Sequence, residues 1–146
     1  MVALVLVEWP LIVMHGSFSE VVIKLIKHDD QETIIFELEG LAVATALQQV
    51  LGTLLKGKRV VIFTDNQSVQ SCLVKCKSNN DHMNLIIRSA CSLEEELGLV
   101  SGIERVPSQS NPADLSRERL ASYPGMTPTV VNMEAMWHKC LDEKTQ

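Results

Sequence analysis

The sequence predicts an α/β fold in which a mixed sheet is flanked by helices. Short runs of Val, Ile and Leu bounded by turn residues are typical of buried strands, and they alternate with longer segments of helical apolar spacing. The resulting order is strands, helix, strand, helix, helix, strand, helix, which indicates helices packed on a sheet. A length of 146 residues with 46% hydrophobic content fits one globular domain with a single core.

The N-terminal run is predicted to form two short strands. Residues Val2 to Val7 are almost continuously apolar, Trp9-Pro10 interrupts the run, and Leu11 to Met14 resume it. A secretory signal peptide is the alternative, but the run contains Glu8, lacks a basic leader and is too short to span a bilayer. We therefore expect a pair of core strands and no membrane segment.

The longest helix is predicted to follow these strands. Before it, Ser19 to Lys27 suits a short helix, although its β-branched residues leave a strand possible, and Thr33 to Phe36 is a candidate third strand. Apolar residues then recur at helical spacing from Glu39 to Leu55, and Gly57 follows where a C-terminal cap belongs. Glu39 is thus expected at the start of the helix.

One strand and two helices are predicted next. Arg59 to Thr64 reads as a strand, and Asn66 to Lys75 as a helix whose inner face carries Val69, Cys72 and Leu73. The loop from Ser78 to Asp81 offers an N-cap for a third helix that ends at Gly98. The apolar residues of this third helix are Met83, Ile86, Ile87, Ala90, Leu93 and Leu97.

The last part of the chain adds a strand and two helical segments. Leu99 to Val106 is predicted as a strand, followed by a polar loop from Pro107 to Asn111. Pro112 to Arg117 resembles a helix start, because proline suits the first turn, and Val131 to Leu141 is predicted as a terminal helix. We expect one domain over residues 1–122 and a C-terminal tail over 123–146.

The net charge of −5 argues against a protein that holds nucleic acid by bulk electrostatic attraction. A metal-dependent nuclease is not excluded, because bound cations offset a cluster of carboxylates locally. The basic residues form small groups that are more typical of a solvated surface: Lys56, Lys58 and Arg59; Lys75 and Lys77; Arg117 and Arg119.

The four cysteines contain no C-x-x-C pair. Cys72 and Cys76 lie four residues apart on one helix face with His82 nearby, which leaves a zinc site as an alternative. We favour buried free thiols on a helix over this zinc site, and Cys91 and Cys140 are the other two cysteines of the chain. This interpretation implies a reducing, intracellular compartment, either cytoplasmic or nuclear.

Asp65 is the most informative acidic residue, because it follows directly after the run Val60 to Thr64. The C-terminal ends of strands in open α/β sheets are where ligands gather, although the same sequence also fits a strand followed by a helix N-cap. Glu39 and Asp114 lie at two further element boundaries and could converge with Asp65. Carboxylates of this kind bind Mg²⁺, and two ions about 4 Å apart can hydrolyse a phosphodiester.

Three motifs occur in order along the chain. They are Glu39-Gly-Leu-Ala-Val-Ala-Thr-Ala-Leu47, Phe63-Thr64-Asp65-Asn66 and Asn111-Pro-Ala-Asp114-Leu-Ser-Arg117. Together they resemble the ribonuclease H domain of retroelement reverse transcriptases over about residues 30–120. Three ordered motifs are more specific than any one of them.

This resemblance implies a ribonuclease H-like fold, dependence on Mg²⁺ or Mn²⁺, and cleavage of the RNA strand of RNA–DNA hybrids. Carried over by position, Glu39, Asp65 and Asp114 match the second, third and fourth acidic residues of the family and would bind metal. Asn66 would contact the hybrid near the site. A reverse transcriptase domain is an implied partner.

The sequence also departs from the family pattern. The family's first acidic residue lies on the first strand in a D-G-S or D-A-S context, and this chain has no such motif, with only Glu8 as a possible substitute. We interpret the N-terminal runs as the second and third strands, so that the first strand is missing. The alternatives are a catalytically inactive remnant that binds nucleic acid or protein, and a small α/β binding domain whose carboxylates are caps and surface groups.

Overall fold

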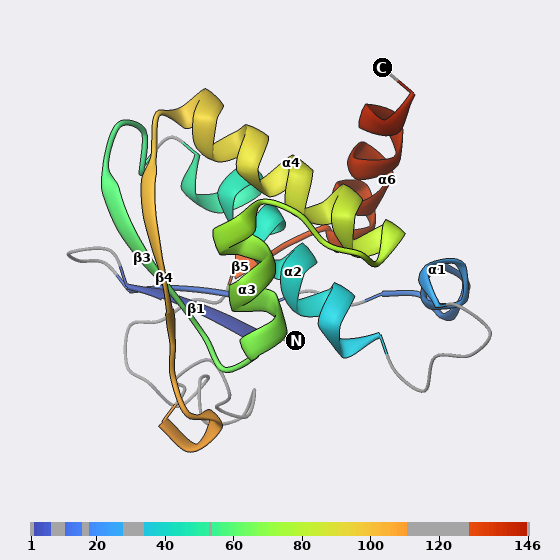
Figure 1. Ribbon diagram of the computed structural model, residues 1–146, viewed down its shortest axis with the longest axis horizontal. Coiled ribbons are helices and arrows are strands. Elements are labelled where there is room, and N and C mark those ends of the chain that lie inside the picture. Colours follow the sequence, from blue (N-terminus) through green and yellow to red (C-terminus); the bar gives the residue numbers. More distant parts are fainter. Residues whose placement is uncertain are drawn as a thin grey trace.

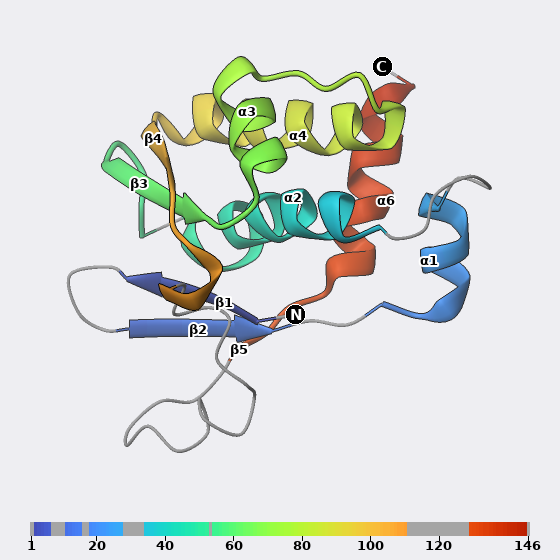
Figure 2. The ribbon, with the colours of Figure 1, turned by 60° about the horizontal axis from the view of Figure 1, so that its bottom comes forward.

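The computed structural model describes residues 2–6, 11–15, 18–27, 34–52, 54–110 and 129–145. Helices α2 (Ile35–Thr45), α3 (Gln67–Lys75), α4 (Asp81–Leu97) and α6 (Met133–Lys144) form the helical part, and α1 (Glu20–Ile26) lies at one side of it (Figure 1). Figure 2 shows α2 between α4 and the N-terminal sheet. The predicted α/β class is therefore confirmed.

The described strands form two sheets. β1 (Val2–Leu6) pairs antiparallel with β2 (Leu11–His15), and β2 pairs in parallel with the short β5 (Thr129–Val130), which gives a mixed sheet in the order β1-β2-β5. β3 (Arg59–Thr64) pairs in parallel with β4 (Val100–Arg105) in a second sheet. The predicted N-terminal strand pair and the two later strands are thus confirmed.

The region before the longest helix differs from the prediction. α2 begins at Ile35, so the strand predicted over Thr33 to Phe36 is wrong, and Glu39 lies in the second turn rather than at the helix start. Ile34, Glu37, Leu41 and Ala44 are all buried, and their spacing of three and four residues is helical. Burial along one helical face outweighs the β-propensity of the Ile-Ile-Phe sequence.

α2 continues into a π-helical segment, η1 (Ala46–Leu51), which ends at Gly52. The buried Thr45 hydroxyl donates a hydrogen bond to the Leu41 carbonyl oxygen at 2.7 Å. The Thr45 hydroxyl thus competes with backbone N–H groups for the Leu41 carbonyl oxygen. This competition favours the wider, π-helical turn that begins at Ala46. The helix C-cap predicted at Gly57 is wrong, because the helix ends at Gly52. Gly57 belongs instead to the turn before β3, where its N–H donates a 2.8 Å hydrogen bond to the Leu97 carbonyl.

The other helices follow their local signals. Asn66 and Asn80 are the N-caps of α3 and α4, and Gly98 ends α4 at a φ of 64°, a backbone conformation that glycine adopts without steric penalty. α1 confirms the helical alternative for Ser19 to Lys27, with the Ser19 side chain accepting a hydrogen bond from the Val22 N–H. A short 3₁₀ segment, η2 (Ser108–Ser110), follows β4. The helix start predicted at Pro112 lies outside the described residues.

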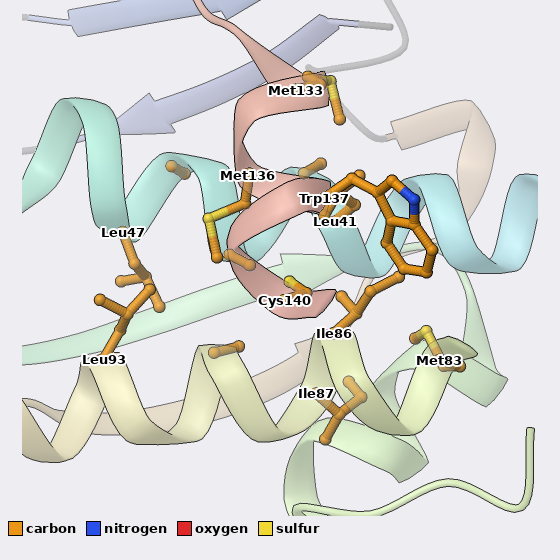
Figure 3. Packing of buried hydrophobic residues seen from close by; sticks show 14 of the residues in the cluster. Leu41, Leu47, Met83, Ile86, Ile87, Leu93, Met133, Met136, Trp137 and Cys140 are labelled. Atoms are coloured by element: carbon orange, nitrogen blue, oxygen red, sulfur yellow. The ribbon is translucent and has the colours of Figure 1, made fainter. Parts of the chain in front are cut away.

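The core lies where α2, α4 and α6 meet (Figure 3). Leu41 of α2, Ile86 of α4 and Trp137 of α6 are fully or almost fully buried there. α2 approaches α4 closely at Gly40, because a Cβ atom at Gly40 would lie 2.5 Å from Cε of Met83. The remaining labelled residues of the cluster are Leu47, Ile87, Leu93, Met133, Met136 and Cys140.

α6 is an integral part of this core. The Gln49 side chain accepts from the Asn132 N–H at 2.9 Å and donates to the Asn132 carbonyl at 2.8 Å. The Glu134 carboxylate accepts a hydrogen bond from the Ser19 N–H, which ties α6 to the start of α1. This bond holds the pKa of Glu134 below its usual value. None of the described helices combines the length and apolarity needed to cross a membrane.

Candidate functional site

β3 carries Asp65 to the edge of the second sheet. β3 and β4 run in parallel register from Arg59 opposite Val100 to Thr64 opposite Arg105, and the pairing continues with a 3.0 Å bond from the Val106 N–H to the Thr64 carbonyl. Both strands therefore end at the same edge, where Asp65 and the segment after β4 leave the sheet together. This is the edge at which open α/β sheets bind ligands.

The helix cap next to Asp65 is Asn66. Its Oδ1 accepts hydrogen bonds from the Ser68 N–H at 3.0 Å and the Val69 N–H at 3.1 Å. Thr64 supports the turn, because its Oγ1 accepts from the Asn66 N–H at 3.2 Å. Asp65 is half-buried, and within the described part of the chain its carboxylate takes no hydrogen bond. The capping role thus falls on Asn66, and the Asp65 carboxylate is not the cap of α3.

Glu39 lies on the element next to this site. It is half-buried in the second turn of α2, and α2 packs against α3, the helix that begins directly after Asp65 and Asn66. Figure 2 shows the end of β3 turning into α3 beside α2. The structure therefore places Glu39 and Asp65 on neighbouring elements.

The third predicted carboxylate, Asp114, and the possible substitute Glu8 lie outside the described residues. Within the described ranges, no three His, Cys, Asp or Glu side chains are grouped so that they could hold a metal ion together. Because the proposed ligand set includes Asp114, this finding does not test it. The convergence of Glu39, Asp65 and Asp114 remains a prediction.

A different carboxylate, Glu37, is the one that the structure buries. Only 1% of Glu37 is exposed, and its Oε1 accepts a hydrogen bond from Nδ2 of Asn80 at 2.9 Å. Asn80 is also the N-cap of α4, accepting from the Met83 N–H at 2.8 Å, so Glu37 lies at the positive end of that helix dipole. Sequence reasoning missed Glu37, although its position in the series Ile34, Glu37, Leu41 marks the buried helix face.

His82 connects three elements near this buried carboxylate. Its Nδ1 lies 2.7 Å from the Ile26 carbonyl at the end of α1, and its ring meets Trp137 of α6 edge-on with centroids 5.3 Å apart. Among the described residues, the buried Trp137 indole N–H has no hydrogen-bond partner. His82 therefore helps to join α1, α4 and α6.

Two of the four cysteines form a disulfide, which corrects the expectation of buried free thiols. Cys76 at the end of α3 is bonded to Cys91 of α4, with Cα atoms 6.2 Å apart, within the range that a disulfide can bridge. Cys72 and Cys140 are free. The zinc alternative with Cys72, Cys76 and His82 is wrong, because Cys76 is not available as a thiolate.

Cys76 has an unusual backbone conformation. It is the C-cap of α3 in the left-handed region, with φ at 52°, and it is the one non-glycine residue with positive φ in the described chain. A side chain in this region costs about 1–2 kcal/mol relative to a right-handed conformation. The disulfide thus lies at a strained helix end.

No family model matches the chain, and neither a curated protein nor a solved structure matches it.

Proposed function

We propose that this chain is a ribonuclease H-like module of retroelement origin that hydrolyses the RNA strand of RNA–DNA hybrids. The observation that carries the proposal is the state of Asp65: it follows a parallel strand, and Asn66 rather than Asp65 caps the next helix. A half-buried carboxylate without a capping role is suited to bind a hard cation. The order of the three sequence motifs supports the same proposal.

Under this proposal, Glu39, Asp65 and Asp114 are the ligands of Mg²⁺ or Mn²⁺. The metal would supply activation of a water and charge stabilisation at the leaving oxygen of the phosphodiester. Glu39 and Asp65 fit this role because they are oxygen ligands on neighbouring elements, both partly buried. Asn66, the neighbour of Asp65, would contact the hybrid, and its Oδ1 accepts the two hydrogen bonds that cap α3.

The proposed partners follow from this activity. The substrate is an RNA–DNA hybrid, and a reverse transcriptase domain would supply such hybrids. A protein with a net charge of −5 gains little affinity for phosphates from bulk charge, so the bound cations would provide most of the local attraction. An intracellular compartment, cytoplasmic or nuclear, belongs to the same proposal.

A second candidate function is a catalytically inactive remnant that binds nucleic acid or another protein. The observation that favours it is the division of the described strands into two sheets, β1-β2-β5 and β3-β4. In the ribonuclease H-like interpretation, the first strand of the fold would lie between them and carry the first acidic residue. The sequence contains no D-G-S or D-A-S motif that supplies this residue.

The test is cleavage of a labelled RNA–DNA hybrid in Mg²⁺ or Mn²⁺, at enzyme concentrations high enough to detect weak activity. We expect metal-dependent cleavage of the RNA strand that is abolished in Asp65→Asn and in Glu39→Gln. The matched control is Glu95→Gln, an exposed carboxylate on α4, which should leave the rate unchanged. Each variant must unfold at the wild-type denaturant concentration.

The same preparation separates the alternatives. Folded wild-type protein that binds the hybrid but does not cut it would favour the inactive remnant. Absence of both binding and cleavage would favour a small α/β domain of another function. Cleavage that persists in Asp65→Asn would refute the metal site proposed here.

A further inference from the structure

We propose that Cys76 and Cys91 form a reversible thiol–disulfide site that a small-molecule thiol of the glutathione class opens at Cys76. This site would control how firmly the end of α3 is attached to α4. The proposal does not depend on the nuclease function, because it rests on the positions and exposure of the four cysteines.

Exposure decides which sulfur reacts. Cys76 is exposed at the end of α3, whereas Cys91 is half-buried on α4. The free thiols are less accessible, since Cys72 is half-buried and Cys140 is fully buried. An incoming thiolate needs a direct approach to the sulfur that it attacks, which favours Cys76. Exposed disulfides are also the ones that most often exchange.

The chemistry is a two-step exchange. The small-molecule thiolate attacks Sγ of Cys76, a new S–S bond forms there, and Cys91 leaves as a thiolate that takes up a proton. A second small-molecule thiolate then attacks the mixed disulfide, which releases the small-molecule disulfide and leaves Cys76 as a thiol. Two small thiols are oxidised and one protein disulfide is reduced, and a small-molecule disulfide reverses both steps.

Opening the bond removes a main attachment of α3. Among the described residues, this nine-residue helix is also held by the buried side chains of Val69 and Leu73, by the packing of Cys72 against the core, and by a 3.2 Å bond from Nε2 of Gln70 to the Ile103 carbonyl. Reduction frees the Cys76 side chain from Cys91, while the hydrogen bonds of the Cys76 N–H to the Cys72 and Leu73 carbonyls remain. Because α3 begins directly after Asp65 and Asn66, its motion reaches the proposed site.

The first measurement identifies the reacting sulfur. The double variant Cys72→Ser/Cys140→Ser retains only the proposed pair and is equilibrated folded in glutathione buffers of increasing reducing strength. After acid quench and alkylation, mass spectrometry should show the disulfide converting to two thiols, with any glutathione adduct on Cys76. An adduct mainly on Cys91, or two alkylatable thiols already present in fully oxidising buffer, would overturn the proposal.

The second measurement tests the effect on α3. Hydrogen exchange of the amides of α3 in the same double variant should increase by about tenfold or more on reduction, because the helix loses its covalent link. The matched control adds Cys76→Ser and Cys91→Ser, and its exchange should not respond to glutathione. Equal exchange of α3 in oxidised and reduced protein would overturn the proposed control of the helix.

Discussion

Two helix starts in this molecule use the same cap and place a carboxylate beside it, yet they differ in what that carboxylate does. At the start of α4, Asn80 caps the helix and also donates a hydrogen bond to Glu37, which is 1% exposed. At the start of α3, Asn66 uses its Oδ1 for two backbone amides, and the adjacent Asp65 is half-buried with no hydrogen bond from a described residue.

The difference separates a structural carboxylate from a candidate functional one. Burial of a carboxyl group costs less where hydrogen bonds and helix dipoles compensate it, and the Asn80 amide and the N-terminus of α4 provide such compensation at Oε1 of Glu37. A ligand for a metal or a substrate must instead keep its oxygens available. The position of Asp65 fits that second requirement, which is why the two starts should respond differently to substitution.

The largest effect on stability is expected at the α4 start. Glu37→Ala should reduce the free energy of unfolding by about 3 kcal/mol, because it removes a buried partner of Asn80 and leaves a cavity. Asp65→Ala should change it by less than about 0.5 kcal/mol, because the half-buried Asp65 carboxylate makes no hydrogen bond with a described residue. Urea unfolding of both variants measures the contrast. Equal losses would remove the distinction between the two starts.

Substitution of the two cap residues should also reduce stability by different amounts, but with a smaller difference. Asn66→Ala should cost about 1 kcal/mol of unfolding free energy, the usual value for a lost N-cap, whereas Asn80→Ala should cost about 2 kcal/mol because it also removes the hydrogen bond to Oε1 of Glu37. A double-mutant cycle makes the comparison sharper. Glu37 and Asn80 should be coupled by at least about 0.5 kcal/mol, whereas Asp65 and Asn66 should be additive.

Close packing near the α4 start gives a third prediction. In Gly40→Ala, the new Cβ would lie 2.5 Å from Cε and 2.8 Å from Sδ of Met83, so the Met83 side chain must move. We expect the free energy of unfolding to fall by about 1 kcal/mol, because the steric strain outweighs the higher helix propensity of alanine. Gly102→Ala on β4 is the control, because its Cβ would have no atom within 4 Å. A thermal melt that shows a similar loss in Gly102→Ala would contradict the packing argument.

The smallest effect concerns alkaline pH. Burial raises the pKa of the Cys140 thiol above its usual value of 9.0, and the nearby Glu143 carboxylate adds to the rise. The neutral Cys140 thiol makes its full contribution to the free energy of unfolding below pH 9.0. This contribution is lost as the pH rises through the raised pKa of the folded state, because the thiol ionises first in the unfolded chain.

This loss can be measured in a Cys72→Ser background, in which Cys140 is the remaining free thiol. The free energy of unfolding should fall more steeply between neutral and alkaline pH than in a Cys72→Ser/Cys140→Ala protein. Parallel pH profiles of the two proteins would show that the buried thiol makes no difference.

The elements that the sequence predicts well are those with local signals. α3 and α4 begin at asparagine caps, and α4 ends at Gly98, so their bounds could be predicted within one or two residues. α2 was predicted to start too late, because Ile34, Ile35 and Phe36 favour a strand locally and are drawn into the helix by burial against the core. Local propensity decides an element only where tertiary contacts do not oppose it.

In the candidate site, too, some features follow from the local sequence and others depend on tertiary contacts. The position of Asp65 at a strand end follows from a short contiguous sequence and was predicted correctly. The Glu37–Asn80 hydrogen bond joins residues 43 positions apart, and the Cys76–Cys91 bond joins two helices. Such pairs depend on how helices pack in space, and neither residue type nor sequence spacing reveals them.

The place of α6 in the core has a consequence for how the chain folds. The bond between Ser19 and Glu134 joins residues 115 positions apart, and the bonds between Gln49 and Asn132 join residues 83 positions apart. Trp137 and Met136 fill the centre between α2 and α4, so these helices have no final partner until residues 133–144 have been synthesised. During translation the nascent chain must therefore expose the parts of α2 and α4 that α6 later covers, and chaperones and proteases would meet the chain in this state.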